Sequence, residues 1–396
     1  MWYLLMITLM AVFAAGLLYL SFRAARASFV QRLAKGEKGR GRLMCAAAFL
    51  ALFVLLWALL NLMNALIVFV HLFIIWGICD LVVFVAGKLL CRGPAKVEVP
   101  AKVAEGPVDD SGDPQPALTR RNFTGAAAML LCAAYLTKGW DNDHRVRATR
   151  YAFSTPKLTG TVRIAQISDT HLGATFHADR FAEYLEEINT FAPDIFVVTG
   201  DFVDDDTSRE DMLGACAALA RVRATHGVFY VYGNHDKGYY PEAIRGWNNA
   251  EMRAALSAAG VTVLEDEAVP LPCGVTVVGR QDRSENAKGT PRATAEALLS
   301  DVDRSTYTLM LDHQPADFAA EAAAGADLVL CGHTHGGQLI PLRLIGGTLG
   351  INDAWYGHER RRSTDFIVSS GMSNWSLQFK TGCFSEFVII DLAGTR

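Results

Sequence analysis

The sequence of 396 residues predicts an α/β domain that follows three or four transmembrane helices. Two observations support this prediction. Apolar stretches dominate residues 1–90. After about residue 150, short β-branched segments that end in polar clusters alternate with amphipathic segments of helical periodicity.

The charge changes at the same place along the chain. Residues 1–150 contain 17 Lys/Arg and 9 Asp/Glu, whereas residues 151–396 contain 20 and 32, so the net charges are +8 and −12. Proteins that grip nucleic acid along its backbone usually present a basic surface, so the acidic C-terminal part argues against nucleic acid as a partner. Bound divalent metal ions would offset part of this charge and allow a small phosphate ester to bind.

Three apolar segments within residues 1–90 are expected to cross a membrane. They lie at about 1–22, 43–62 and 65–87, and each is close to the ~20 residues that a spanning helix needs. The loop between the first two contains a single acid, Glu37, against seven basic residues: Arg23, Arg26, Arg32, Lys35, Lys38, Arg40 and Arg42. By the positive-inside rule this loop is cytoplasmic, which predicts a multi-pass protein of the inner membrane.

The region between the apolar segments and the α/β domain admits three interpretations. Residues 91–121 are rich in Pro, Gly and charge and predict a linker. Arg120 and Arg121 then precede a short apolar run, so residues 122–138 are either a twin-arginine-like export signal, a fourth transmembrane segment, or a segment that packs on the domain. The first two interpretations place the domain outside the cytoplasm, which is our expectation, and the third leaves it inside.

Five predicted strands in the C-terminal part end in side chains that bind metal ions. Open α/β sheets bind ligands at the carboxyl ends of their strands, so we expect these side chains to meet at one edge. Asp169 and His171 follow 161–168, Asp201 follows 194–199, Asn234 follows 227–232, His313 follows 307–311, and His333 and His335 follow 327–331.

These residue types suit a pair of divalent ions. Alternate residues of an extended segment point the same way, so Asp169 can share a site with His171, as His333 can with His335. The two oxygens of a carboxylate such as Asp201 can bridge two ions, and imidazole nitrogens and an amide oxygen can complete the coordination. Such a pair of ions polarises a phosphoryl oxygen and generates hydroxide near neutral pH.

The set of motifs resembles that of the calcineurin-like metallophosphoesterases over residues 161–391. The matching motifs are Asp169-x-His171, Gly200-Asp201-x-x-Asp204, Gly233-Asn234-His235-Asp236, His313 and Gly332-His333-x-His335. The resemblance implies a metal-dependent phosphoric ester hydrolase with a four-layer α/β/β/α sandwich over 151–396. It also implies one metal ion held by Asp169, His171, Asp201 and His335, and another held by Asp201, Asn234, His313 and His333, with Asp201 as the bridge.

The resemblance further implies roles around these ligands. His235 would donate a proton to the leaving oxygen, Asp236 would orient His235, and Asp204 would support the metal site without binding the ions. A metal-bridging hydroxide would attack, so no phosphoenzyme is expected. Gly337 and Gln338 are expected substrate contacts, and the ligand types suit Mn, Fe or Zn.

The twin-arginine-like segment and the GHTHGGQ stretch resemble the membrane-anchored bacterial envelope phosphodiesterases. This resemblance implies a phosphate mono- or diester substrate, which can be lipid-linked. An alternative is a lipid-linked pyrophosphatase of the UDP-2,3-diacylglucosamine hydrolase type with a cytoplasmic catalytic domain. A non-catalytic membrane scaffold is a further alternative, and degenerate metal ligands would favour it.

Overall fold

The structure is a computed structural model that describes residues 2–90, 120–340, 350 and 352–395. The chain forms two compact units, Met1–Thr137 and Lys138–Arg396. Most of the expected linker lies outside the described residues.

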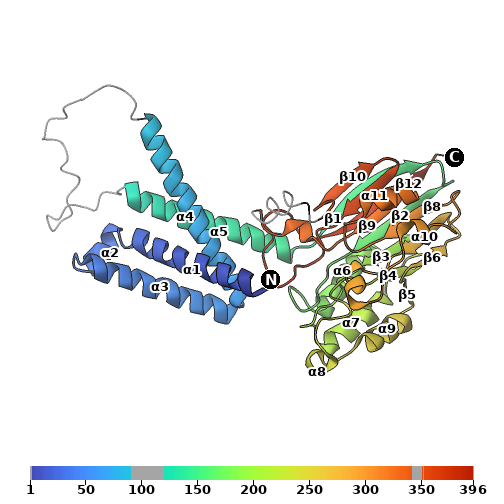
Figure 1. Ribbon diagram of the computed structural model, residues 1–396, viewed down its shortest axis with the longest axis horizontal. Coiled ribbons are helices and arrows are strands. Elements are labelled where there is room, and N and C mark those ends of the chain that lie inside the picture. Colours follow the sequence, from blue (N-terminus) through green and yellow to red (C-terminus); the bar gives the residue numbers. More distant parts are fainter. Residues whose placement is uncertain (1, 91–119, 341–349, 351, 396) are drawn as a thin grey trace. The chain divides into compact units, whose positions relative to one another are not determined.

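The N-terminal unit is helical (Figure 1). Its helices are α1 (Trp2–Ala24), α2 (Ser28–Leu33), α3 (Lys38–Leu59), α4 (Leu62–Leu90) and α5 (Arg120–His144), of which α5 continues into the second unit. Within the part of the chain that the structure describes, two segments are long and apolar enough to cross a membrane, Lys38–Leu59 and Leu62–Ala86, and a shorter apolar stretch covers Met10–Ala24. The expected count of three or four spans therefore stays a prediction.

A charged pair lies between α1 and α4. Asp80, on α4, accepts hydrogen bonds from the Tyr19 hydroxyl and from the Arg23 guanidinium of α1. An isolated carboxylate is costly in an apolar environment, and these two partners offset that cost. Asp80 thus faces another helix.

The C-terminal unit contains two six-stranded sheets (Figure 1). In the first, the order is β1 (Arg147–Thr155), β12 (Glu386–Gly394), β2 (Thr161–Ile167), β3 (Ile195–Thr199), β4 (Val228–Val231) and β5 (Val261–Val263). In the second, the order is β10 (Gly357–Arg361), β11 (Thr364–Val368), β9 (Leu328–Cys331), β8 (Tyr307–Leu311), β7 (Val275–Gly279) and β6 (Glu267–Pro270). Strands β2 to β5 are parallel to one another, as are β7, β8, β9 and β11.

Both faces of the central strands are buried, which explains their uninterrupted apolar sequences. In β3, Ile195 and Val197 join a core that also contains Leu309 of β8, so it lies between the sheets. Phe196 and Val198 point the other way, because side chains alternate along a strand, and pack with residues of α6, α7 and α9. The equivalent outer core of the second sheet includes residues of α10 and α11. The expectation of a mixed α/β fold is confirmed.

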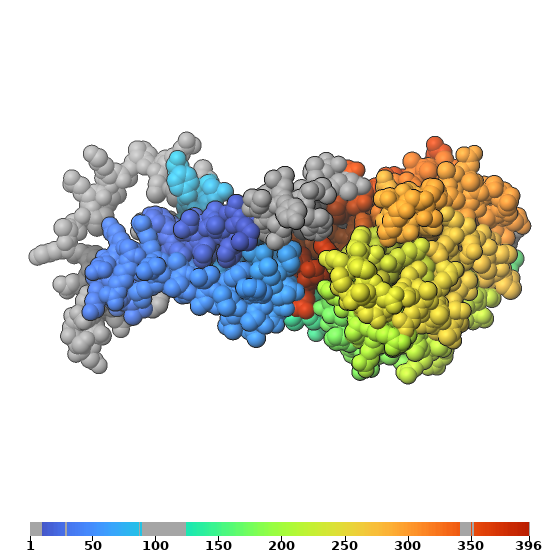
Figure 2. Space-filling view, turned by 60° about the horizontal axis from the view of Figure 1, so that its bottom comes forward, coloured from blue at the N-terminus to red at the C-terminus, as the bar shows by residue number. Residues whose placement is uncertain are grey.

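The helices of this unit are short. They are α6 (Ala178–Asn189), α7 (Arg209–Leu219), α8 (Glu242–Arg245), α9 (Asn249–Ala258), α10 (Ala295–Leu298) and α11 (Phe318–Ala324), with 3-10 turns at Arg283–Lys288 and His335–Gly337. In space-filling view the segment from α8 to α9 lies among the yellow atoms of the visible face (Figure 2).

The five ligand-bearing strands are distributed differently from the sequence expectation. Strands β2, β3 and β4 belong to the first sheet and β8 and β9 to the second, with β5, β6 and β7 between them in the chain. The sheets still bring their strand ends together, since Gln166 Nε2 of β2 donates a 3.0 Å hydrogen bond to the carbonyl of Cys331 in β9.

Candidate metal centre

The loops after these strands hold their polar residues in an uncommon backbone conformation. A residue with a Cβ atom that adopts left-handed backbone angles is strained by roughly 1–3 kcal/mol, and residues with such strain cluster at functional sites. Five expected ligands adopt it: Asp169 (φ 47°), His171 (φ 37°), Asp201 (φ 50°), His333 (φ 70°) and His335 (φ 49°).

Two glycines let the backbone approach the carboxylates closely. A Cβ atom on Gly233 would lie 2.2 Å from Asp201 Oδ1, and one on Gly332 would lie 2.2 Å from Asp169 Oδ2. Only glycine fits at such distances, so the Gly-Asn-His-Asp and Gly-His-Thr-His motifs require their first residue for packing.

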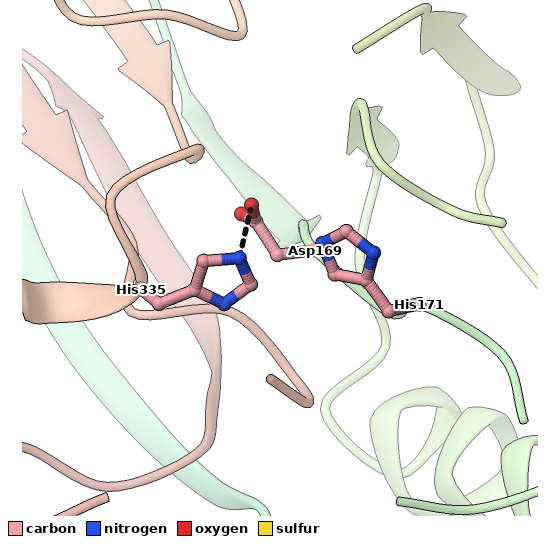
Figure 3. A group of neighbouring side chains, drawn as sticks. All are labelled: Asp169, His171 and His335. Atoms are coloured by element: carbon pink, nitrogen blue, oxygen red, sulfur yellow. Dashed lines mark ion pairs between the residues drawn. The ribbon is translucent and has the colours of Figure 1, made fainter. Parts of the chain in front are cut away.

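One group of donors consists of Asp169, His171 and His335 (Figure 3). Asp169 and His171 come from the loop after β2, and His335 comes from the loop after β9, so the two sheets contribute to one group. His335 Nε2 lies 3.5 Å from Asp169 Oδ1, and the rings of His171 and His335 have centroids 5.0 Å apart. All three residues are buried.

A second group consists of Asp201, His313 and His333, and Asn234 lies beside His313. His313 Nε2 lies 3.1 Å from Asp201 Oδ2 and 3.3 Å from Asn234 Oδ1. The same oxygen of Asp201 lies 3.6 Å from His171 Nε2, which belongs to the first group. Asp201 Oδ2 therefore lies between the two groups.

Three of the histidines direct Nε2 toward the carboxylates because Nδ1 is held by an oxygen acceptor. His171 Nδ1 donates to Asp204 Oδ2 (3.1 Å), His313 Nδ1 to the Thr199 carbonyl (2.8 Å), and His335 Nδ1 to the Ser373 carbonyl (3.2 Å). Such anchoring is typical of metal-binding imidazoles. His171 Nε2 is buried without a hydrogen-bond partner, and a metal ion would satisfy it.

The electrostatics of the buried groups also suit cations. Burial would raise the pKa of Asp201, but the positive charges of His313, His171 and His235 and the hydrogen bond from His313 together outweigh burial and hold that pKa well below its usual range. Burial and the charge of His313 lower the pKa of His333 to about 4. Burial and the charge of His171 lower the pKa of His335 well below its usual value. His333 and His335 are thus neutral near pH 7, with a nitrogen lone pair free to bind a metal ion.

Comparison with known proteins agrees with this geometry. Residues 162–337 match the family described as Calcineurin-like phosphoesterase. An uncharacterized metallophosphoesterase of Aquifex aeolicus is 36% identical over 258 residues, which cover 63% of this chain and 92% of that protein. The chain belongs to the calcineurin-like phosphoesterase family.

This chain covers a smaller share of the length of other relatives, less than two thirds in the two that follow. An uncharacterized metallophosphoesterase of Campylobacter jejuni is 27% identical over 246 residues, covering 61% of this chain and 62% of that protein. A Bos taurus protein named transmembrane protein with metallophosphoesterase domain is 28% identical over 246 residues, covering 58% of this chain and 53% of that protein. This calcineurin-like phosphoesterase is a metal-dependent phosphoester hydrolase, and its apolar N-terminal helices indicate membrane association.

The contacts of Asp204 and Asp236 differ from the roles that the resemblance implies for them. Asp204 Oδ1 accepts a 2.9 Å hydrogen bond from His235 Nδ1, so Asp204, rather than Asp236, orients the His235 ring. The carboxylate of Asp236 instead accepts backbone N–H groups of Asp201, Phe202, Val203 and Gly233 at 2.7–3.2 Å. Asp236 fixes the loops that carry the ligands, because one carboxylate holds the turns after β3 and β4 together.

The expected substrate contacts lie next to the first group of donors. Gly337 is buried and follows His335 in the same 3-10 turn. Gln338 (φ 48°) donates from Nε2 to the Trp375 carbonyl at 3.3 Å and accepts at its own carbonyl from Thr381 N at 2.8 Å. These contacts connect the turn to the C-terminal loop 369–381.

Several residues that support the site were not identified from the sequence. Ser168 Oγ donates to Asp169 Oδ2 at 2.5 Å, and Gly371 (φ 78°) packs against Asp169 so closely that a Cβ would lie 2.6 Å from Asp169 Cβ. Lys380, near the end of the loop 369–381, is also buried. The Ser-Asp pair and the glycine in Ser-Ser-Gly are visible signals, but nothing in the sequence marks Lys380.

Replacing Asp204 by Asn is expected to lower kcat roughly 10- to 100-fold, since Asp204 positions both His171 and His235. Burial would raise the pKa of Asp204, but its hydrogen bonds with the two histidines outweigh burial and keep it ionised. An Asn side chain offers one acceptor, so one histidine loses its anchor. Steady-state kinetics of the full-length protein measure the change.

Asp206→Asn is the matched control, because Asp206 is an exposed acid of the same loop. Its kcat should stay within twofold of the unsubstituted protein. Equal kcat values for Asp204→Asn and the unsubstituted protein would contradict the positioning role.

Proposed function

We propose that this chain is a membrane-anchored phosphoesterase that uses two metal ions to hydrolyse phosphate mono- or diesters outside the cytoplasm. The observation that carries the proposal is the position of Asp201 Oδ2 between the two donor groups, 3.1 Å from His313 Nε2 and 3.6 Å from His171 Nε2. A four-layer sandwich and a multi-pass anchor are part of the proposal.

The proposed ligand sets follow the two donor groups. Asp169, His171 and His335 would hold one ion together with Asp201, which would be shared with the set of Asn234, His313 and His333. Bound divalent ions, with Mn, Fe or Zn as candidates, would polarise a phosphoryl oxygen and lower the pKa of bound water. The chain itself would hold the phosphate between the groups and exclude water by its buried walls.

His235 is the proposed proton donor to the leaving oxygen. Burial would lower its pKa, but the hydrogen bond with Asp204 and the negative charge of Asp201 outweigh burial and raise it to about 9. His235 therefore carries a proton near pH 7 and can donate it from Nε2, because Nδ1 is bonded to Asp204.

The full-length protein should hydrolyse a nitrophenyl phosphodiester with Mn²⁺, lose activity in chelator and regain it when Mn²⁺ is restored. Asn234→Ala should reduce kcat/KM roughly 10- to 100-fold through loss of one ligand.

Asn248→Ala is the control for this substitution. It removes the N-cap of α9, whose side chain accepts from Glu251 N, and should cost about 1 kcal/mol of stability with activity unchanged. Full activity of the protein in the presence of chelator, or full activity of the Asn234→Ala variant, would contradict the two-metal proposal.

A separate experiment tests on which side of the membrane the catalytic unit lies. The basic loop between α1 and α3 supports a cytoplasmic position for that loop and an exocytoplasmic catalytic domain. Alkaline phosphatase fused to the C-terminus in a bacterial host should be active, because that reporter folds only outside the cytoplasm. An inactive fusion with an active cytoplasmic reporter at the same site would reverse the orientation.

A further inference from the structure

An exposed tyrosine lies at the edge of the second donor group. Tyr239 is 56% exposed, whereas Asn234, whose side chain it contacts, is only 7% exposed. Asn234 Nδ2 donates a 2.9 Å hydrogen bond to the hydroxyl oxygen of Tyr239. We infer, on the basis of the proposed function, that Tyr239 is a further catalytic residue, whose hydroxyl donates a hydrogen bond to a phosphoryl oxygen of the substrate.

The amide of Asn234 leaves the hydroxyl hydrogen of Tyr239 available. Asn234 Oδ1 faces the donor group, 3.3 Å from His313 Nε2, so the amide meets Tyr239 with its N–H end. The phenol oxygen is the acceptor in this bond, and within the described residues its hydrogen is donated to no other group. A phenol with its ordinary pKa of about 10 keeps that hydrogen at pH 7.

Tyr239 contacts two residues to which the proposed function assigns roles. Its hydroxyl is bonded to Asn234, a proposed metal ligand, and its ring lies edge-on to that of His235, the proposed proton donor, with centroids 5.1 Å apart. A phosphoryl group that binds the metal ions and directs its leaving oxygen at His235 would therefore lie beside Tyr239. A hydroxyl can donate to one of its other oxygens, and hydrogen bonds to a charged acceptor are among the strong ones.

The backbone that carries Tyr239 is held in place. The Asp205 carboxylate accepts from Tyr239 N at 3.0 Å and pairs with Arg245 Nε at 3.3 Å, and the Arg245 side chain is only 2% exposed. Gly238 (φ 76°) packs on the same guanidinium so closely that a Cβ would lie 2.2 Å from Arg245 Nη1. The hydroxyl is thus positioned before the substrate binds, and a preorganised donor needs no rearrangement during the reaction.

Tyr239→Phe tests the inference, because it removes the hydroxyl and keeps the ring. The Mn²⁺-loaded, full-length protein in lipid nanodiscs is titrated with methylphosphonate, whose oxygens resemble those of a phosphate ester. Calorimetry should give a dissociation constant roughly 10- to 100-fold higher for the variant, as expected for loss of a hydrogen bond to a charged group. The dissociation constant for Mn²⁺ should change less than about threefold, and kcat/KM for the nitrophenyl phosphodiester should fall about as much as the phosphonate affinity.

Tyr240→Phe is the matched control. Tyr240 is the next residue, is 57% exposed, and donates from its backbone N–H to the same Asp205 carboxylate at 3.1 Å. The hydroxyl that Asn234 contacts, however, is that of Tyr239. Tyr240→Phe should therefore keep the affinity for methylphosphonate and the value of kcat/KM within about twofold of the unsubstituted protein.

Each other outcome contradicts the inference. If Tyr239→Phe and the unsubstituted protein bound methylphosphonate equally well, the hydroxyl would not contact the phosphoryl group, and the proposed function would stand. A loss of Mn²⁺ affinity in Tyr239→Phe, with phosphonate affinity restored by excess Mn²⁺, would show that Tyr239 acts only through Asn234. An equal loss in Tyr240→Phe would assign the effect to the loop as a whole. Failure of methylphosphonate to bind the unsubstituted protein would reject the proposed function together with the inference.

Discussion

Asp201→Asn is expected to lower kcat/KM about 1,000-fold, equivalent to about 4 kcal/mol of transition-state stabilisation. Asp201 Oδ2 lies between the two donor groups, so loss of its charge weakens both of them. The amide has nearly the same size as the carboxylate, and Asp201 Oδ1 also accepts from His235 N at 2.8 Å, a bond that the amide oxygen can retain. The fold should therefore survive while metal binding fails.

Two measurements separate these effects. Elemental analysis of the purified full-length variant should show less than one equivalent of bound metal where the unsubstituted protein holds two, and circular dichroism should be unchanged. Asp391→Asn is the control, because Asp391 pairs with Arg163 Nε at 2.6 Å outside the donor groups. A fully active Asp201→Asn variant, or one that binds two equivalents of metal, would show that Asp201 does not bridge the groups.

The proposed ligands could be located in the sequence because each follows an apolar strand in a short motif. Asp169, Asp201 and His333 stand directly after, or within two residues of, segments whose burial is visible in the sequence. The resemblance implied two sheets, but which ligand-bearing strands belong to which sheet could not be read from the sequence, since β5 to β7 carry no ligand to mark the change of sheet. Sheet membership depends on long-range pairing that leaves no local pattern in the sequence.

The supporting contacts were harder to predict because many use the backbone. His313 and His335 are anchored by the carbonyls of Thr199 and Ser373, and any residue supplies a carbonyl. Asp236 was expected to orient its neighbour His235, but adjacent side chains in the turn diverge, and the Asp236 carboxylate points to backbone N–H groups instead. Asp204 lies 31 positions before His235 and still reaches its Nδ1.

Lys380→Met is expected to weaken metal binding roughly 10- to 100-fold and to lower stability by about 1–3 kcal/mol. The Lys380 side chain is fully buried, and its ammonium donates to the carbonyls of Ser370 (2.6 Å) and Gly371 (3.0 Å). Burial lowers the pKa of Lys380, while Cys383 and nearby acids such as Asp143 favour its charged form. Methionine fills similar space but leaves the Ser370 carbonyl without this donor, whereas the Gly371 carbonyl keeps its hydrogen bond from Glu386 N at 2.9 Å.

The effect on metal binding follows from what this loop touches. Gly371 packs on Asp169, Ser373 N donates to the Asp169 carbonyl at 3.0 Å, and the Ser373 carbonyl anchors His335. A loop released by loss of Lys380 would therefore let two proposed ligands of one ion move. Metal titration followed by calorimetry should show one weakened site and one site of nearly unchanged affinity, because His313 and Asn234 do not depend on this loop.

Lys157→Met separates this loss from a general loss of stability. Lys157 Nζ pairs with Asp327 at 2.6 Å, and Asp327 directly precedes β9, whereas the ligands follow the ends of the strands. This variant should melt at a lower temperature and bind both ions with unchanged affinity. If Lys380→Met behaved in the same way, Lys380 would stabilise the fold without positioning the ligands, and packing and backbone hydrogen bonds would suffice to hold the loop 369–373 at Asp169.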